Sequence, residues 1–140
     1  MKIFYVCICF AFLAVTFVQA NLNEELEKHA EICTEQSKVT PEELEKFFAN
    51  GMQAQDATDP VKCHFKCIME QNQFFADGNL ESEAILKYLE AKESMKDHLD
   101  DVAAAIAACN NMKVEHDCDG AFKLIECFGY TDAGKMAFVA

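Results

Sequence analysis

Two cysteines and a histidine lie within about one helical turn in the stretch DPVKCHFKCIMEQ, which begins at Asp59. Thiolates and an imidazole at the spacing of Cys63, His64 and Cys67 could supply half of a zinc site. The same two cysteines could instead form a redox pair or anchor two disulfides. These chemistries belong to different compartments, because thiols stay reduced in the cytosol and oxidise outside the cell. The destination of the chain therefore decides between them.

The first 20 residues predict that destination. Lys2 precedes an apolar run from Ile3 to Val18, and Val18 and Ala20 are small residues at the positions that a signal peptidase reads. The next residues, NLNEELEKHAE, are abruptly polar. We therefore expect a secretory signal peptide over residues 1–20 and a secreted, extracellular mature protein over residues 21–140, with no stable membrane insertion after cleavage. An uncleaved membrane anchor is the alternative.

Removal of the signal peptide takes Cys7 and Cys9 with it and leaves six cysteines: Cys33, Cys63, Cys67, Cys109, Cys118 and Cys127. An even number of cysteines in a secreted chain indicates disulfides. A zinc site would need unpaired thiolates, and the Cys-x3-Cys spacing is not that of a thioredoxin-like pair. We expect three disulfides, no metal and no cofactor. Several pairings of six cysteines remain open from the sequence.

The charge of the chain excludes several functions. There are 24 acidic residues against 12 basic ones, all of them lysine, and loss of Lys2 with its single positive charge changes the net charge from −12 to −13. Long-range repulsion makes nucleic acid a poor partner for such a chain. No catalytic serine motif, phosphate loop or calcium loop occurs, and no two histidines have helical metal-site spacing. We therefore expect a protein that is not an enzyme.

Apolar residues recur at helical spacing throughout the mature chain, and none alternate long enough to predict a strand. Expected caps are Thr40 with Pro41, Asp59 with Pro60, Ser94 and Asp117. The helices expected from these signals cover about residues 22–33, 41–50, 59–73, 82–90, 94–109 and 117–129. The sequence thus predicts one all-α domain of six short helices, followed by an apolar tail after a flexible turn at residues 131–134.

The cysteines follow the pattern C-x29-C-x3-C-x41-C-x8-C-x8-C. This pattern resembles that of the insect odorant-binding proteins, in their six-cysteine pheromone-binding and general odorant-binding branches, over nearly the whole mature chain. The resemblance implies the pairing Cys33–Cys67, Cys63–Cys118 and Cys109–Cys127. It also implies a compact six-helix domain, cross-linked by disulfides, that encloses an apolar cavity.

With that cavity in view, we expect its wall to be formed by apolar residues of the last four helices and the tail. The expected ligand-binding residues are Phe65, Ile68, Met69, Ile85, Tyr88, Leu89, Leu99, Val102, Ile106, Phe122, Ile125 and Phe138. The alternative for each is that it belongs to an ordinary core. Met136, Phe138 and Val139 are expected to close the cavity, and protonation of His98 or His116 could favour release of the ligand. A disordered tail without influence on binding is the alternative.

These observations lead to one expected function. The protein would be a secreted carrier that reversibly binds small hydrophobic molecules, such as odorants, pheromones or lipid-derived signals, in an extracellular fluid, with olfaction as one setting. A chemosensory receptor or a second copy in a weak homodimer would be its further partners. The competing hypothesis is a secreted helical protein that acts on a receptor or protease, with any pocket incidental.

Overall fold

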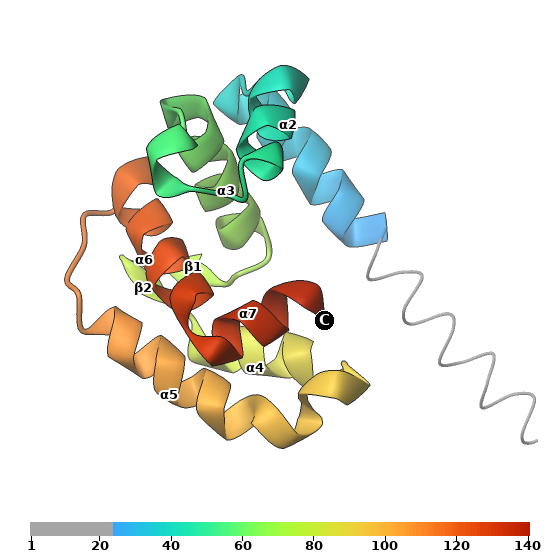
Figure 1. Ribbon diagram of the computed structural model, residues 1–140, viewed down its shortest axis with the longest axis vertical. Coiled ribbons are helices and arrows are strands. Elements are labelled where there is room, and N and C mark those ends of the chain that lie inside the picture. The colour runs from blue at the N-terminus through green and yellow to red at the C-terminus, as the bar shows by residue number, and fades with distance from the viewer. Residues whose placement is uncertain (1–23) are drawn as a thin grey trace, which may run out of the picture.

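The computed structural model describes residues 24–140 of the chain. The predicted signal peptide lies outside these residues. Figure 1 shows the described part as helices folded around one another, with residues 1–23 drawn in grey. Seven α-helices occur within it, so the predicted all-α fold is confirmed.

The helices begin with an unlabelled one over residues 24–37. It is followed by α2 (Pro41–Ala49), α3 (Asp59–Gln71), α4 (Ser82–Glu90), α5 (Leu99–Asn110), α6 (Cys118–Tyr130) and α7 (Asp132–Val139). Two short 3₁₀ helices, η1 (Ala54–Asp56) and η2 (Glu93–His98), precede α3 and α5. Two strands of two residues each, β1 (Phe75–Ala76) and β2 (Asn79–Leu80), connect α3 to α4.

Helix starts follow from side chains that satisfy the free backbone N–H groups of the first turn. The predicted cap at Thr40 forms a full capping box, because Thr40 accepts from the N–H of Glu43 while the Glu43 carboxylate accepts from the N–H of Thr40. Asp117 likewise accepts from the N–H of Gly120 at 2.7 Å. The predicted cap at Asp59 is wrong: Thr58 accepts from the N–H of Val61, and Asp59 is already helical.

The start of the fifth helix also differs from the prediction. Ser94 lies inside η2 and does not cap α5, which begins at Leu99. Met95 in η2 is nevertheless buried, with only 1% of it exposed. Met95 therefore packs in the same core as Val102, although it lies in a 3₁₀ helix and not in α5.

The sequence predicted no strand, whereas Phe75 pairs with Leu80 and Ala76 with Asn79 in an antiparallel hairpin. Two-residue strands are too short to produce a period-two pattern, which explains the error. The turn between them needs left-handed backbone, and Asp77 (φ 52°) and Gly78 (φ 77°) provide it.

The C-terminal tail is a helix rather than a flexible segment. The Thr131 hydroxyl accepts from the N–H of Gly134 at 2.9 Å and so caps α7. A side chain at Gly134 would collide with the carbonyl of Phe128, which means that the start of α7 packs directly on the end of α6. The segment 131–134 is therefore an ordered cap, and the expectation of a flexible turn there was wrong.

Three disulfides connect the helices. They join Cys33 to Cys67, Cys63 to Cys118 and Cys109 to Cys127, the pairing that the family resemblance implies. The first ties the helix over residues 24–37 to α3, the second ties α3 to α6, and the third ties α5 to α6. Helices α3 and α6 each take part in two of the three disulfides and are bonded to one another, so this pair connects the N-terminal helix to α5. Figure 1 shows α6 running between α3 and α7.

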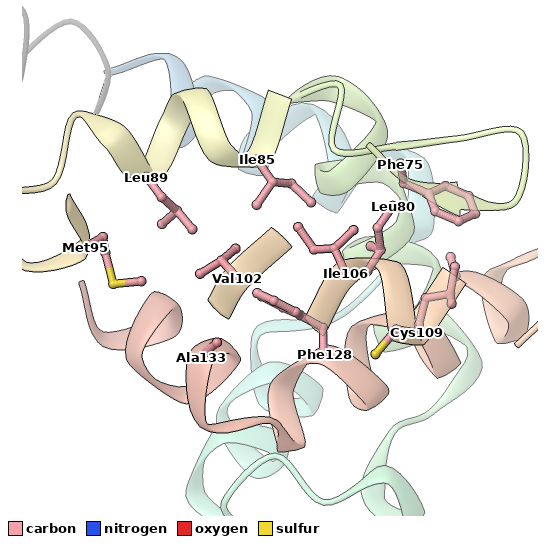
Figure 2. Close-up of a cluster of buried hydrophobic side chains, with 12 residues drawn as sticks. Phe75, Leu80, Ile85, Leu89, Met95, Val102, Ile106, Cys109, Phe128 and Ala133 are labelled. Carbon is pink, nitrogen blue, oxygen red and sulfur yellow. The ribbon is translucent and has the colours of Figure 1, made fainter. Parts of the chain in front are cut away.

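The buried side chains form two clusters on either side of α6. The large core lies among α4, α5, α6 and α7, where Figure 2 shows Ile85 and Leu89 pointing toward Val102 and Ile106, with Phe128 opposite. The small core contains Val39, Phe47, Val61 and Phe122. Phe122 and Phe128 of the same helix thus face different clusters, and the pocket described next opens beside the small core.

Candidate functional site

Aromatic rings from three helices meet in the small core. The ring of Phe47 on α2 lies 5.6 Å from that of Phe65 on α3 and 6.0 Å from that of Phe122 on α6, measured between centroids. Phe65 and Phe122 are 6.3 Å apart. These tilted and edge-on contacts are the geometries that aromatic pairs favour. The rings therefore form a packed apolar wall.

A pocket of about 140 Å³ lies against this wall and is partly open to solvent. Its lining residues are Phe47, Gly51, Met52, Phe65, Phe122, Ile125, Glu126, Gly129, Tyr130 and Phe138. An apolar cavity of roughly 150 Å³ stays dry and binds a molecule the size of benzene. The pocket can therefore hold a small apolar molecule or one end of a longer one.

Helix α6 supplies half of the ten lining residues, more than any other element. Phe122, Ile125, Glu126 and Gly129 follow one another at i, i+3, i+4 and i+7, which places them along one side of the helix. The chain that follows α2 also lines the pocket, through two consecutive left-handed residues, Gly51 (φ 75°) and Met52 (φ 58°). A left-handed methionine is uncommon and strained, and this conformation turns the chain back beside the pocket.

The twelve residues expected to bind ligand separate into two groups. Phe65, Phe122, Ile125 and Phe138 line the pocket together. Seven others belong to or pack against the large core: Met69, Ile85, Tyr88, Leu89, Leu99, Val102 and Ile106. Ile68 is half-buried on α3. The role of each of the twelve in binding stays a prediction, and the structure adds that only four share one pocket surface.

Six lining residues were missed from the sequence: Phe47, Gly51, Met52, Glu126, Gly129 and Tyr130. Two of them had a usable signal, because Glu126 and Gly129 continue the helical register of Phe122 and Ile125. The position of Phe47 on the apolar face of its helix predicts only that it belongs to a core. The positions of Gly51, Met52 and Tyr130 follow from where helices end, which periodicity does not determine.

The polar groups near the pocket are few. Glu126 is half-buried, and none of the ion pairs within residues 24–140 involves it. His64 contacts its chain neighbour Phe65 edge-on, with ring centroids 6.0 Å apart, and is only 5% exposed. Burial lowers the pKa of His64, opposed by a backbone hydrogen bond with Cys33. Its Nδ1 has no hydrogen-bond partner among the described residues.

This arrangement is suited to binding. Within residues 24–140 no cluster of three His, Cys, Asp or Glu side chains could hold a metal ion. The same residues contain no helix long and apolar enough to cross a membrane. A disulfide-linked helical domain with an aromatic, partly open pocket defines a protein that binds small apolar molecules.

Comparison with known proteins gives the family. The model of the PBP/GOBP family matches residues 16–130, which makes the chain a member of that family. Its members are binding proteins for small hydrophobic molecules and are not enzymes. The family predicted from the cysteine spacing is thereby confirmed.

Individual proteins that resemble this chain support the family assignment. General odorant-binding protein 56a of Drosophila melanogaster is 33% identical over 115 residues, which cover 77% of this chain and 76% of the relative. The fatty acid binding protein OBP56a from the oral disk of the blowfly Phormia regina matches with a TM-score of 0.63 and 25% identity, over 86% of this chain and 95% of that one. Odorant binding protein 5 of Apis mellifera shares the fold, with a TM-score of 0.60, 20% identity and coverage of 84% and 93%.

Proposed function

We propose that this protein is secreted and carries small hydrophobic molecules, such as odorants or lipid-derived signals, reversibly through an extracellular fluid. The observation that carries the proposal is the pocket between α2, α3, α6 and α7, with its wall of phenylalanine rings. An apolar molecule gains about 25 cal/mol for each Å² that it removes from water in such a pocket.

Secretion is supported by the predicted signal peptide and by the disulfides, which persist in oxidising compartments. Reversible binding is supported by the partly open pocket, since a ligand can leave without unfolding of the domain. The relative from the blowfly oral disk is described as a fatty acid binding protein, which supports a ligand with a hydrocarbon chain.

A fluorescent apolar probe tests the proposal directly. We expect the mature protein, residues 21–140, to bind the probe saturably at one site, and odorant-sized molecules to displace it. Binding that does not saturate, or that no small apolar molecule reverses, would refute a carrier function. Analysis of culture medium from insect cells that express the full chain would test secretion and cleavage after Ala20.

One observation favours the competing role as a protein-binding molecule. Large apolar side chains remain exposed on the described surface: Ile32, Phe48, Met52, Met112, Tyr130, Phe138 and Val139. Three of them, Met52, Tyr130 and Phe138, also line the pocket, so entry of a ligand accounts for their exposure. A carrier therefore explains the pocket and part of the exposed surface together, and we prefer it.

A further inference from the structure

The pocket carries one charge. Of the described residues that line it, Glu126 is the only one with an ionisable acid or base of the kind that is charged at neutral pH, and Tyr130 adds a hydroxyl four residues later on α6. The other lining residues are apolar or glycine. A ligand that fills the pocket therefore meets an apolar wall, a single acidic group and one phenolic hydroxyl.

The lysines near α6 are engaged elsewhere. Lys62 contacts Asp119 at 2.8 Å, and Lys123 contacts the same carboxylate at 2.9 Å. Neither lysine lines the pocket. A ligand that carries a negative charge would consequently find Glu126 in the pocket without a lining cation to balance it.

An ionised carboxylate only accepts hydrogen bonds, whereas a hydroxyl both donates and accepts. The polar end of a ligand that suits Glu126 must then be a donor. An alcohol can donate to the Glu126 carboxylate, and a protonated amine can donate and also gain charge attraction. A fatty acid carboxylate can do neither, and it pays for repulsion between like charges at short range.

From this geometry we propose that Glu126 makes the pocket selective for apolar ligands whose polar end donates a hydrogen bond, namely alcohols or amines, against ligands that end in a carboxylate. The inference rests on the proposed carrier function and specifies the chemical class of its ligand. It distinguishes this chain from the structurally similar protein that is described as a binder of fatty acids.

The test is a displacement titration at neutral pH with three molecules of equal chain length: octanol, octylamine and octanoate. We expect octanol and octylamine to displace a fluorescent apolar probe at concentrations about tenfold lower than octanoate. Equal displacement by all three would overturn the inference while the carrier function stands. Failure of the probe to bind at all would refute the carrier function itself, and the inference with it.

The variant Glu126→Gln removes the charge and keeps the shape. We expect octanoate to gain about tenfold in affinity and octylamine to lose a similar factor, with octanol changed by less than about threefold, because the amide oxygen still accepts. Glu90→Gln is the matched control, since Glu90 is exposed at the end of α4 and does not line the pocket. The same shift in both variants would mean that net charge, and not Glu126, sets the preference, and would overturn the inference.

Discussion

Phe138 of α7 packs over Gly129 of α6, so closely that a β-carbon at Gly129 would lie 3.1 Å from Cε2 of the phenylalanine ring. Both residues line the pocket. The absence of a side chain at position 129 therefore lets the C-terminal helix contribute an aromatic ring to the pocket wall. The ring centroids of Phe138 and Phe128 are 6.3 Å apart, and Phe128 belongs to the large core.

Gly129→Ala tests this relationship. Alanine raises helix propensity, so the free energy of unfolding should rise by up to about 1 kcal/mol. Phe138 is 57% exposed, so its ring can move aside from the added methyl group. The displaced ring should lower probe affinity about threefold. Thermal melts and probe titrations measure the two effects, with Phe138→Ala as the reference for complete loss of the ring. Unchanged affinity in both variants would show that α7 does not contribute to binding.

Substitution of two isoleucines on neighbouring helices tests whether the ligand binds in the pocket or in the large core. Ile106 is 1% exposed in the large core, so Ile106→Ala should cost about 2–5 kcal/mol of stability and leave the affinity of the folded protein unchanged. Ile125 is half-buried and lines the pocket, so Ile125→Ala should cost less stability and weaken probe binding about fivefold to tenfold. Urea unfolding and probe titration of both proteins make the comparison. The reverse pattern would place the ligand in the large core.

His64 predicts how stability depends on pH. Because burial lowers the pKa of its ring in the folded protein, the unfolded chain binds more protons between the lowered and the ordinary value. The contribution of neutral His64 to the free energy of unfolding should therefore be fully present above about pH 6.5. It should be lost as the pH falls through the lowered pKa of the folded protein. The pKa values of the Glu43 and Asp119 carboxyl groups are also lowered, that of Asp119 to about 2. These two groups therefore change stability in more acidic solution than His64 does.

The variant His64→Gln isolates this contribution. Its free energy of unfolding should depend less on pH between neutrality and about pH 5 than that of the parent protein, since glutamine does not titrate. Urea unfolding at several pH values measures the slope. An equal slope in both proteins would assign the pH dependence to other groups.

The disulfides should differ in their contribution to stability according to the length of chain that each closes. The sequence separations are 55 for Cys63–Cys118, 34 for Cys33–Cys67 and 18 for Cys109–Cys127. A chain-entropy estimate gives about 3 kcal/mol for the shortest loop and about 4 kcal/mol for the longest. Replacing each pair with alanine and measuring urea unfolding should reproduce that order. A larger loss for Cys109–Cys127 than for Cys63–Cys118 would contradict the entropic account.

Deletion of residues 135–140 tests whether the C-terminal helix retains ligand. It removes Phe138 from the pocket wall and Met136 from its packing on the large core, so we expect faster probe dissociation at neutral pH. Deletion of residues 139–140 is the control, because it keeps Phe138. Equal rates in all three proteins would show that α7 does not control release.

The sequence by itself determined six of the seven described helices and the presence of three disulfides, whereas their pairing followed from the family resemblance. Apolar spacing placed six helices correctly within a few residues, and the cap at Thr40 is visible as a local pattern because the bonds join residues three apart. The cysteine spacing identified the family, which the comparison with known proteins confirms. Helix and cap signals depend only on neighbours along the chain, whereas the cysteine pattern spans Cys33 to Cys127 and gains its meaning from the family that shares it.

The tertiary structure alone decided which apolar residues line a pocket. Val102 and Phe122 are equally apolar and helical in the sequence, yet Val102 is packed in the large core and Phe122 lies on the pocket wall. The difference arises because the disulfides Cys63–Cys118 and Cys109–Cys127 fix α6 between α3 and α5, so that its opposite faces meet different neighbours. The ends of α2 and α7 complete the pocket only when the chain turns back at Met52 and at Thr131. Helical periodicity reports that a face is buried, whereas the partner of that face is set by contacts between residues far apart in the chain.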